Sequence, residues 1–314
     1  MKLRLRSLIV LAISACIAMP PANAWNSIGH MAVAYAAYQQ MSPELRTRAL
    51  ALLQKNPDYN KWASYVPASA SPDDRNLYIF MMAATWPDEI KAQGSGYQLD
   101  GDTPPHTPEA TNNTGYTDKY MHKYWHFVNT PFSTDGTSLP AIPTPDAQTQ
   151  IAAFRQVLDD PNASDELKSY DLVWIMHLVG DVHQPLHCAT RITAGARRGD
   201  GGGNSVKLTN DPGDLHGYWD NLLGVGDTKN YSVAVAAAKQ LPAADSAAAA
   251  DANEADWVKE SFQLAQSAVY IAPIGPALGP YTADAAYAAN AHTVAQQRVA
   301  LAGARLANLL QSLK

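Results

Sequence analysis

Histidines and aspartates recur at helical spacing in the middle of the chain, in and after the segment GDVHQPLHCA. His177 and Asp181 form one H-x-x-x-D pair, His216 and Asp220 form a second, and His187 lies between them. Side chains four residues apart share one face of a helix, with Cβ atoms about 5 to 6 Å apart, so each pair can reach one ion. Imidazole and carboxylate groups are ligands that zinc favours. A single such histidine is more often a core residue, but the set of five predicts a metal site.

Three further candidate ligands lie upstream: Asp88 in TWPDEIK, His126 in KYWHFVN and His30 in WNSIGHMAVAY. Taken singly, each has an ordinary explanation, because Asp88 could cap a helix and the two histidines could simply pack in the core. His30 follows Trp25 by five residues, and Trp25 is the expected first residue after a signal peptide. A freed α-amino group has a pKa of about 7.7 to 8.0, so it can deprotonate and offer its nitrogen to a metal.

The first 24 residues predict a secretory signal peptide. Three basic residues precede an apolar run over 8–19, and Ala22-Asn23-Ala24 forms an A-x-A cleavage site. We therefore expect export to the periplasm or the medium, with residues 25–314 as the mature domain. The segment ISAC leaves an alternative, because it resembles a lipoprotein box in which Cys16 would be acylated.

Composition bounds the class of protein. The 314 residues are 46% hydrophobic, which is enough for a real core, and the net charge of −6 becomes −9 once the three basic residues of the predicted signal peptide are removed. This acidic balance argues against the basic surface usual for nucleic-acid binding, although bound divalent cations can reverse the charge locally. After cleavage only Cys188 remains, so an internal disulfide is excluded.

Helical signals dominate the mature chain. Helices are expected over 25–40, after the cap Ser42, over 147–158 after Thr144-Pro145-Asp146, from Ser164 to Pro185, and over 283–313. Loops rich in Gly, Pro, Asn and Thr are expected at 92–119, 130–145, 192–204 and 272–280, and β structure only at 205–209. The fold class is therefore all-α: a single compact multi-helix domain with long loops and at most a short β-hairpin.

The remaining histidines and the cysteine are expected outside the metal site. His183, two residues past Asp181, should face away from the ligands and act structurally. His106 and His122 lie in or near a variable loop and are expected to be solvated, and His292 belongs to the last helix. Cys188 follows a candidate ligand, but a buried, inert thiol is the favoured interpretation.

An ordered series of motifs carries a family resemblance. WNSIGH, WPD, WHF, HLVGDVHQPLH, GGN and LHGYWD follow one another through nearly the whole mature chain. In this set the chain resembles the zinc-dependent, single-strand-specific nucleases of the S1/P1 type, which are relatives of bacterial zinc-dependent phospholipase C. The resemblance implies three zinc ions. Their ligands would be Asp88, His126, His177 and Asp181 for the first; His187, His216 and Asp220 for the second; and Trp25, His30 and Asp181 for the third.

The same resemblance implies an activity and a set of working residues. The protein would be a monomeric hydrolase that cleaves single-stranded DNA and RNA to 5′-phosphorylated products and removes 3′-phosphates from nucleotides. Two residues would be catalytic. Asp181 would bridge two of the zinc ions, and Lys91 would stabilise the charge that develops in the transition state. Phe127 would stack on a base, with Asn129, Gly203 and Asn204 near the base edge. Asn129 stands where fungal members carry an aspartate, which leaves the base preference open.

Two alternatives stay open. A zinc-dependent phospholipase C would share the fold and the metals, although the second H-x-x-x pair ends here in Asp220 where that branch has glutamate. A non-catalytic periplasmic zinc-binding protein would be expected to saturate its metals with protein ligands. The three residues proposed for the second zinc leave room for water, which favours an enzyme. Lys91, Phe127 and the glycines also have ordinary interpretations, as a surface lysine, a core aromatic and a flexible turn.

Overall fold

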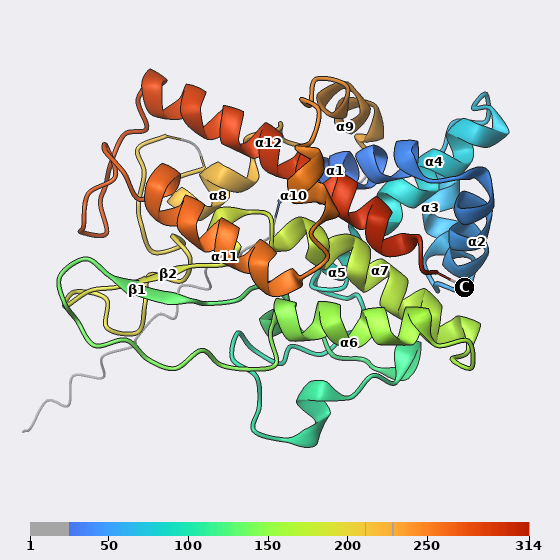
Figure 1. Ribbon diagram of the computed structural model, residues 1–314, viewed down its shortest axis with the longest axis horizontal. Helices are drawn as coiled ribbons and strands as arrows, with labels where there is room; N and C mark the ends of the chain where they lie inside the picture. Colours follow the sequence, from blue (N-terminus) through green and yellow to red (C-terminus); the bar gives the residue numbers. More distant parts are fainter. Residues whose placement is uncertain (1–24, 211, 228, 314) are drawn as a thin grey trace, which may run out of the picture.

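The computed structural model describes residues 25–210, 212–227 and 229–313 (Figure 1). The predicted signal peptide and Cys16 lie outside the described residues. Helix α7 (Asp165–Asp181) runs through the middle of the molecule. It contacts α1 (Ser27–Gln40), α2 (Pro43–Leu53), α6 (Ala147–Asp159) and α12 (Ala285–Leu310). All residues of α7 from Lys168 onward are buried, the polar ones included, so the rest of the fold encloses this helix on every side.

Polar side chains fix where the main helices begin. Ser42 and Ser164 cap α2 and α7 by accepting the amide of the residue three positions on, as their sequence patterns indicate. The first helix begins at Ser27 rather than 25, because the Asn26 side chain accepts two amides and so takes the cap position. For α6 the cap is Asp146, not Thr144, because Asp146 forms a capping box with Thr149.

Besides these five, the described residues form seven other α-helices. They are α3 (Tyr59–Tyr65), α4 (Pro72–Ala83), α5 (Trp86–Glu89), α8 (Leu215–Asp220), α9 (Tyr231–Ala238), α10 (Ser246–Ala250) and α11 (Glu254–Leu264). Turns of 3₁₀ helix occur at η1 (Pro108–Thr111), η2 (Gly115–Thr117), η3 (Lys123–His126) and η4 (Pro185–His187), and η5 (Ala265–Val269) is a π-helical turn that continues α11. The expectation of an all-α architecture is confirmed, although the apolar segment expected to stay helical to Pro185 leaves the α-helix at Asp181.

The β structure differs from the expectation. Strands β1 (Pro131–Ser133) and β2 (Thr190–Ile192) pair in parallel, with Phe132 opposite Arg191, so the sheet among the described residues is not a hairpin. The expected strand over 205–209 forms only isolated bridges, which involve Lys207 and Leu208. A parallel pair joins segments that are distant in sequence, and no local turn signal marks such a pairing.

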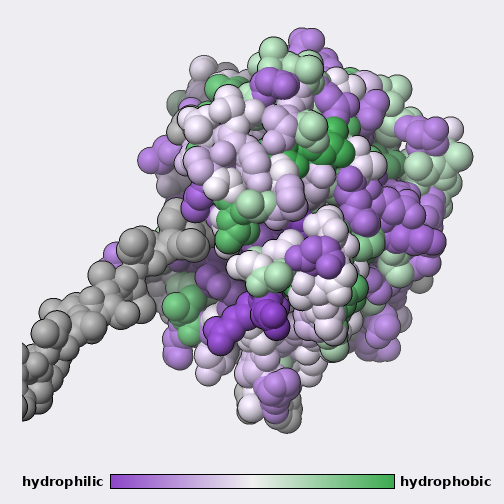
Figure 2. All heavy atoms as spheres, turned by 90° about the vertical axis from the view of Figure 1, so that its left-hand side faces the viewer, coloured by the Kyte–Doolittle hydropathy of each residue, from purple (hydrophilic) through white to green (hydrophobic). Residues whose placement is uncertain are grey.

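No helix in the described ranges is long and apolar enough to cross a membrane. On the face shown in Figure 2, hydrophilic residues are interspersed with small apolar areas. The apolar bulk lies inside, where seven tryptophans are buried: Trp25, Trp62, Trp86, Trp125, Trp174, Trp219 and Trp257. This core packs around α7 and so fixes the helix that carries His177 and Asp181.

Candidate metal centre

The fold brings eight of the nine predicted ligands together in three groups. In each group one nitrogen or oxygen from every member lies within 4.8 Å of the others. The groups are Asp88, His126 and His177; His30, His177 and Asp181; and His187, His216 and Asp220. His177 belongs to two groups, so both of these groups lie against α7.

The α7 pair faces two other elements. The Nε2 atom of His177 lies 3.4 Å from Oδ2 of Asp181 and 3.6 Å from Oδ1 of Asp88 in α5. His126, at the end of η3, places its Nδ1 atom 3.0 Å from Nε2 of His177 and 3.1 Å from Oδ2 of Asp181. The Nδ1 atom of His177 lies 2.8 Å from the carbonyl oxygen of Ala84, to which it donates, so its Nε2 carries a lone pair directed at the group.

The His187 and His216 rings are oriented in the same way. His187 donates from Nδ1 to the carbonyl of His126 at 2.6 Å, and His216 donates from Nδ1 to the carbonyl of Gly202 at 2.7 Å. Both Nε2 atoms therefore present lone pairs, and they face each other at 3.1 Å. Two acceptors at that distance repel each other unless a cation lies between them. Backbone carbonyls that orient metal-binding histidines are a common feature of metal sites.

The Gly-rich loop serves this orientation through its backbone. Gly201, Gly202 and Gly203 all have positive φ, a conformation that favours glycine. A Cβ atom on Gly202 would collide with the carbonyl oxygen of Leu186, so a side chain there would displace the carbonyl that holds His216. The predicted role of this loop concerned base recognition, and its contact with His216 was missed because a backbone carbonyl leaves no signal in the sequence.

Gln184 is a second residue that sequence reasoning missed. It is fully buried, and its side-chain amide donates to Oδ1 of Asp220 at 2.7 Å while its side-chain oxygen accepts the amide of Leu186 at 2.6 Å. This leaves Oδ2 of Asp220 turned towards Nε2 of His216, at 3.5 Å. The signal was present in the segment DVHQPLH, where Gln184 stands between an expected ligand helix and His187.

His30 and Trp25 also lie against α7, near its C-terminal end. The His30 ring stacks on His177 with centroids 3.7 Å apart, and its Nε2 atom lies 3.3 Å from Oδ1 of Asp181. A Cβ atom on Gly180 would be 2.9 Å from Nδ1 of His30 and 3.9 Å from Cδ1 of Trp25, so the glycine gives both rings access to the helix. Trp25 is itself fully buried.

Burial sets the protonation of these groups. Burial is the largest cause that lowers the pKa of His30, to about 4, and those of His126, His177 and His187 well below the usual range. Burial likewise raises the pKa of Asp181 and Asp220 well above that of an ordinary carboxyl. Neutral imidazoles are the form that binds metal ions, and a cation would in turn favour the ionised carboxylates.

The residue set fits a metal ion on an independent observation. Both ring nitrogens of His30, Nε2 of His126 and Oδ1 of Asp181 are buried and have no hydrogen-bond partner among the described residues. Of these atoms, Nε2 of His30 and Oδ1 of Asp181 lie 3.3 Å apart within one group, and two buried polar atoms without partners at one place indicate a cation that binds both. Three groups of imidazole and carboxylate donors match the ligand chemistry of zinc.

The expected substrate residues lie in three places. Lys91 is not a surface lysine, because its side chain is only 4% exposed and its Nζ atom lies 2.7 Å from Oδ1 of Asp88. Phe127 and Asn129 line one small depression together with Tyr124 and Pro145. Gly203 and Asn204 do not line it: Gly203 is buried against Leu186, and the Asn204 amide donates to the Gly201 carbonyl at 2.6 Å.

The histidines expected outside the site lie only partly where the sequence predicted them. His183 is buried and joins none of the three groups, and His106 is exposed. The expectation that His122 is solvated is wrong: its ring stacks on Trp125 at 3.5 Å and its Nε2 atom lies 2.7 Å from Oδ2 of Asp118. Besides these two local neighbours, Asp100 and Trp174 contact it from segments distant in sequence, which loop position alone does not reveal. Cys188 is a buried free thiol.

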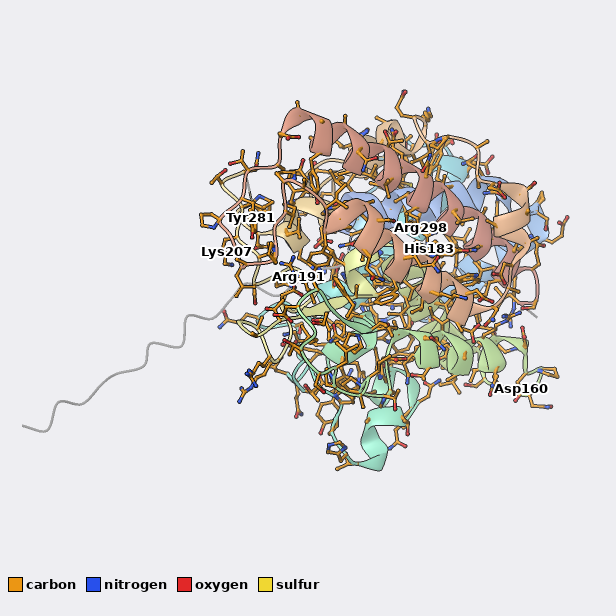
Figure 3. The ribbon with its side chains drawn as sticks, turned by 60° about the vertical axis from the view of Figure 1, so that its left-hand side comes forward. Asp160, His183, Arg191, Lys207, Tyr281 and Arg298 are labelled. Atoms are coloured by element: carbon orange, nitrogen blue, oxygen red, sulfur yellow. The ribbon has the colours of Figure 1, made fainter. Side chains whose placement is uncertain are left out.

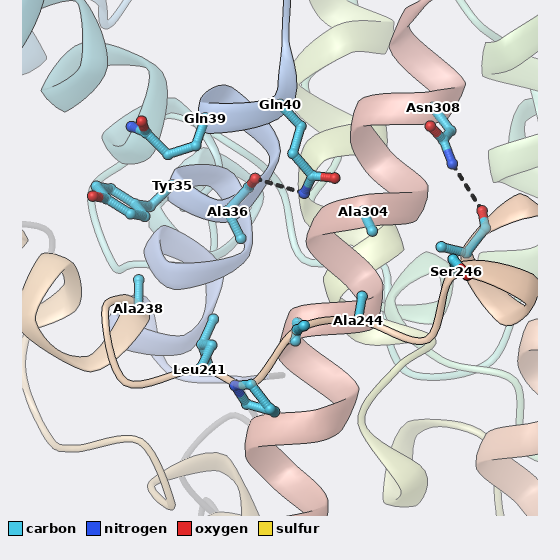
Figure 4. Close-up of a pocket in the computed structure, with 14 residues that line it drawn as sticks. Tyr35, Ala36, Gln39, Gln40, Ala238, Leu241, Ala244, Ser246, Ala304 and Asn308 are labelled. Carbon is cyan, nitrogen blue, oxygen red and sulfur yellow. Dashed lines mark hydrogen bonds between the residues drawn. The ribbon is translucent and has the colours of Figure 1, made fainter.

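A groove of about 570 Å³ lies elsewhere, between α1, α12 and the chain that joins α9 to α10 (Figure 4). Tyr35, Gln39 and Leu241 are among its lining residues, and Gln40 donates to the Ala36 carbonyl at its edge. None of the grouped histidines and aspartates lines it. The convergent donors, not this groove, therefore mark the candidate functional site.

The fold and these groups define a helical protein with three clusters of side chains that could hold metal ions. The S1/P1 Nuclease family model matches residues 25–314, and the chain belongs to this family. It is similar to Nuclease P1 of Penicillium citrinum, with 26% identity over 210 residues, which is 65% of this chain and 57% of the relative. It is also similar to Nuclease S1 of Aspergillus oryzae, with 25% identity over 214 residues, or 68% of this chain and 58% of the relative. The match thus spans a little under three fifths of these curated relatives.

Proposed function

We propose that this protein is a three-zinc phosphodiesterase that hydrolyses single-stranded DNA and RNA to 5′-phosphorylated products and also removes 3′-phosphates from nucleotides. The observation that carries the proposal is the pair of facing Nε2 lone pairs on His187 and His216, next to two further groups of buried donors. The family match supports a nuclease in particular, rather than a metal-storage protein.

The proposed zinc ligands come from the three groups, with Asp181 added to the first group and Trp25 in place of His177 in the group of His30. Asp88, His126, His177 and Asp181 would hold the first ion, and His187, His216 and Asp220 the second. The third would take His30, one oxygen of Asp181, and the amino nitrogen and carbonyl oxygen of Trp25 after cleavage of the first 24 residues. Zinc bound in this way supplies Lewis-acid activation of water and neutralises charge on a phosphate.

The chain's own residues orient and assist this chemistry. Carbonyls of Ala84, His126 and Gly202 fix the imidazole rings, so little reorganisation is needed on binding. Lys91 is held beside Asp88, where its ammonium group can reach a phosphoryl oxygen and stabilise the negative charge that builds up in the transition state. A fixed positive charge in a buried setting acts more strongly than one in water.

We attribute the proposed preference for single strands over duplexes to Phe127 and Asn129. Phe127 directly follows the ligand His126 and is half-buried in the depression that it shares with Asn129, so an unpaired base could stack on its ring close to the metals. Paired bases hide their faces, which favours single strands. For Gly203, which is buried against Leu186, and for Asn204, which is partly exposed, a role at the base edge rests on the family resemblance alone.

Export and charge fit the same proposal. Residues 1–24 would serve as a signal peptide, and the mature chain over 25–314 would act as a monomer in the periplasm or the medium. Its formal charge of −9 is no obstacle, because three divalent ions would place six positive charges where the phosphate binds.

The test is product analysis with the chain that begins at Trp25. Single-stranded DNA, a 3′-mononucleotide and phosphatidylcholine are incubated in parallel, with and without a chelator, and the Asp181→Asn variant controls for contaminating nucleases. We expect chelator-sensitive release of 5′-phosphorylated nucleotides that the variant lacks. Lipid cleavage without nucleotide release would instead place the protein with the phospholipases C, and activity on none of the three would favour a zinc-binding protein.

A further inference from the structure

Behind the metal centre, α11 and α12 send charged side chains to the end of α7. Arg298 and Arg305 of α12 are 5% and 1% exposed, and both pair with Glu260 of α11. Arg305 binds both oxygens of Glu260 at 2.7 Å, and Arg298 binds Oε2 at 2.9 Å. None of these residues belongs to a ligand group, and the proposed chemistry makes no use of them.

The network reaches α7 through His183. Arg305 donates from Nη1 to Nε2 of His183 at 3.0 Å, and the Nδ1 atom of His183 donates to the Val179 carbonyl at 2.7 Å. Arg298 lies next to His183 (Figure 3), and its Nε atom donates to the His183 carbonyl at 3.3 Å. His183 is thus held at both ring nitrogens and at its backbone.

A second branch reaches the same helix end. Arg298 donates from Nη2 to the hydroxyl of Ser261 at 2.8 Å, and Ser261 donates to the Val182 carbonyl at 2.5 Å. The thiol of Cys188, next to the proposed ligand His187, also lies 3.4 Å from this carbonyl. One polar network therefore touches the chain on both sides of the segment between Asp181 and His187.

The location explains why such a network is needed. The last carbonyls of a helix have no partners within the helix and carry a partial negative charge, and at α7 they are buried. Two guanidinium groups against one carboxylate leave a net positive charge beside these carbonyls. Asp181 is the last residue of α7, so its carboxylate can hold a fixed place only if this helix end does not fray.

We propose that Arg298 and Arg305 are positioning residues, which fix the C-terminal end of α7 and so place Asp181 and His187 for metal binding. The inference rests on the proposed metal function of these two ligands. Partners that orient metal ligands indirectly cost about 10 to 100-fold in metal affinity when they are removed, and this is the loss expected here.

The experiment compares Arg298→Met and Arg305→Met with Leu306→Ala in α12. Leu306 is fully buried but apolar, and its truncation destabilises the core without removing a polar contact. Zinc affinity is measured by competition with a chromophoric chelator, and the stability of the metal-free proteins by thermal unfolding. We expect both arginine variants to bind at least one zinc about tenfold more weakly, and Leu306→Ala to bind like the unaltered protein.

Unchanged zinc affinity in folded arginine variants, or an equal loss in Leu306→Ala, would overturn the inference and leave the proposed function intact. Failure of the unaltered protein to bind zinc would overturn the proposed function instead. If an arginine variant does not fold, Glu260→Gln tests the same network from a side chain that is 33% exposed. A weaker zinc affinity in that variant would support the inference, and an unchanged one would count against it.

Discussion

The Nε2 atoms of His187 and His216 face each other at 3.1 Å, while a backbone carbonyl holds the opposite nitrogen of each ring. This arrangement is unfavourable in the metal-free protein and becomes favourable with a cation between the rings. Removal of metal by a chelator should therefore lower the melting temperature reversibly. At free zinc about 1000 times the dissociation constant, one site adds about 4 kcal/mol, or on the order of 10 °C. Scanning calorimetry before and after zinc is restored tests this, and an unchanged melting temperature would contradict it.

Asp181 should be the most sensitive single carboxylate. Asp181→Asn removes the negative charge and replaces one of the two oxygens proposed to bind different ions by an amide nitrogen, and we expect loss of bound zinc and of most hydrolytic activity. Asp171→Asn is the matched control, because Asp171 is equally buried on the same helix but pairs with Asn113, at 2.8 Å, away from the ligand groups. Zinc content measured by atomic emission should fall only in the first variant. Equal zinc content in both would remove Asp181 from the centre.

Gly202 should be required for its backbone. An alanine at φ +59 costs roughly 1 to 2 kcal/mol, and its Cβ would also collide with the Leu186 carbonyl. We expect Gly202→Ala to misplace the carbonyl that orients His216 and to weaken one zinc while the others stay bound. Gly136→Ala has a similar φ of +79 but open space around it, so it controls for strain alone. Identical zinc stoichiometry in the two variants would show that this loop does not serve the metal.

The sequence predicted the ligand pairs because their spacing is local. His177 with Asp181, and His216 with Asp220, lie one helical turn apart, and the period of the helix brings each pair to one face. The groups that orient these rings could not be predicted in the same way. The carbonyls of Ala84 and Gly202 belong to segments remote from the helices they serve, and every residue carries a carbonyl, so none is distinctive.

The errors have the same origin. His122 was expected in solvent because its surroundings read as a loop, yet it is buried: its backbone amide donates to Asp100 and its ring lies against Trp174, and both residues are distant in sequence. The parallel pairing of β1 with β2 joins two short segments that lack alternating strand patterns, so neither was distinguishable from a loop. The burial of Arg298 and Arg305 was not predicted, because arginines on an amphipathic helix are ordinarily exposed.

Acid should remove the contribution of Glu260 to stability. Burial acts to raise the pKa of Glu260, but hydrogen bonds from Arg305 and Arg298 hold it below its ordinary value of 4.5. A lowered carboxyl pKa stabilises the fold above the unfolded value, and that stabilisation is lost as the pH falls through the folded value. The difference in unfolding free energy between the metal-free protein and Glu260→Gln should therefore shrink from pH 7 to pH 4. Urea titrations measure it, and a constant difference would contradict the assignment.

The N-terminus should matter for one metal only. Trp25 is buried and packs with His30 against Gly180, beside the proposed third zinc. One extra residue before Trp25 converts its amino group into an amide, which cannot bind a metal in the same way, so a Met-Trp25 chain should bind the third zinc more weakly. The first two ions, held only by side chains, should be retained. Zinc titration of the two chains by calorimetry would separate the sites, and a chain that starts at Asn26 would control for loss of the indole. Identical isotherms for the Trp25 and Met-Trp25 chains would exclude the amino group as a ligand.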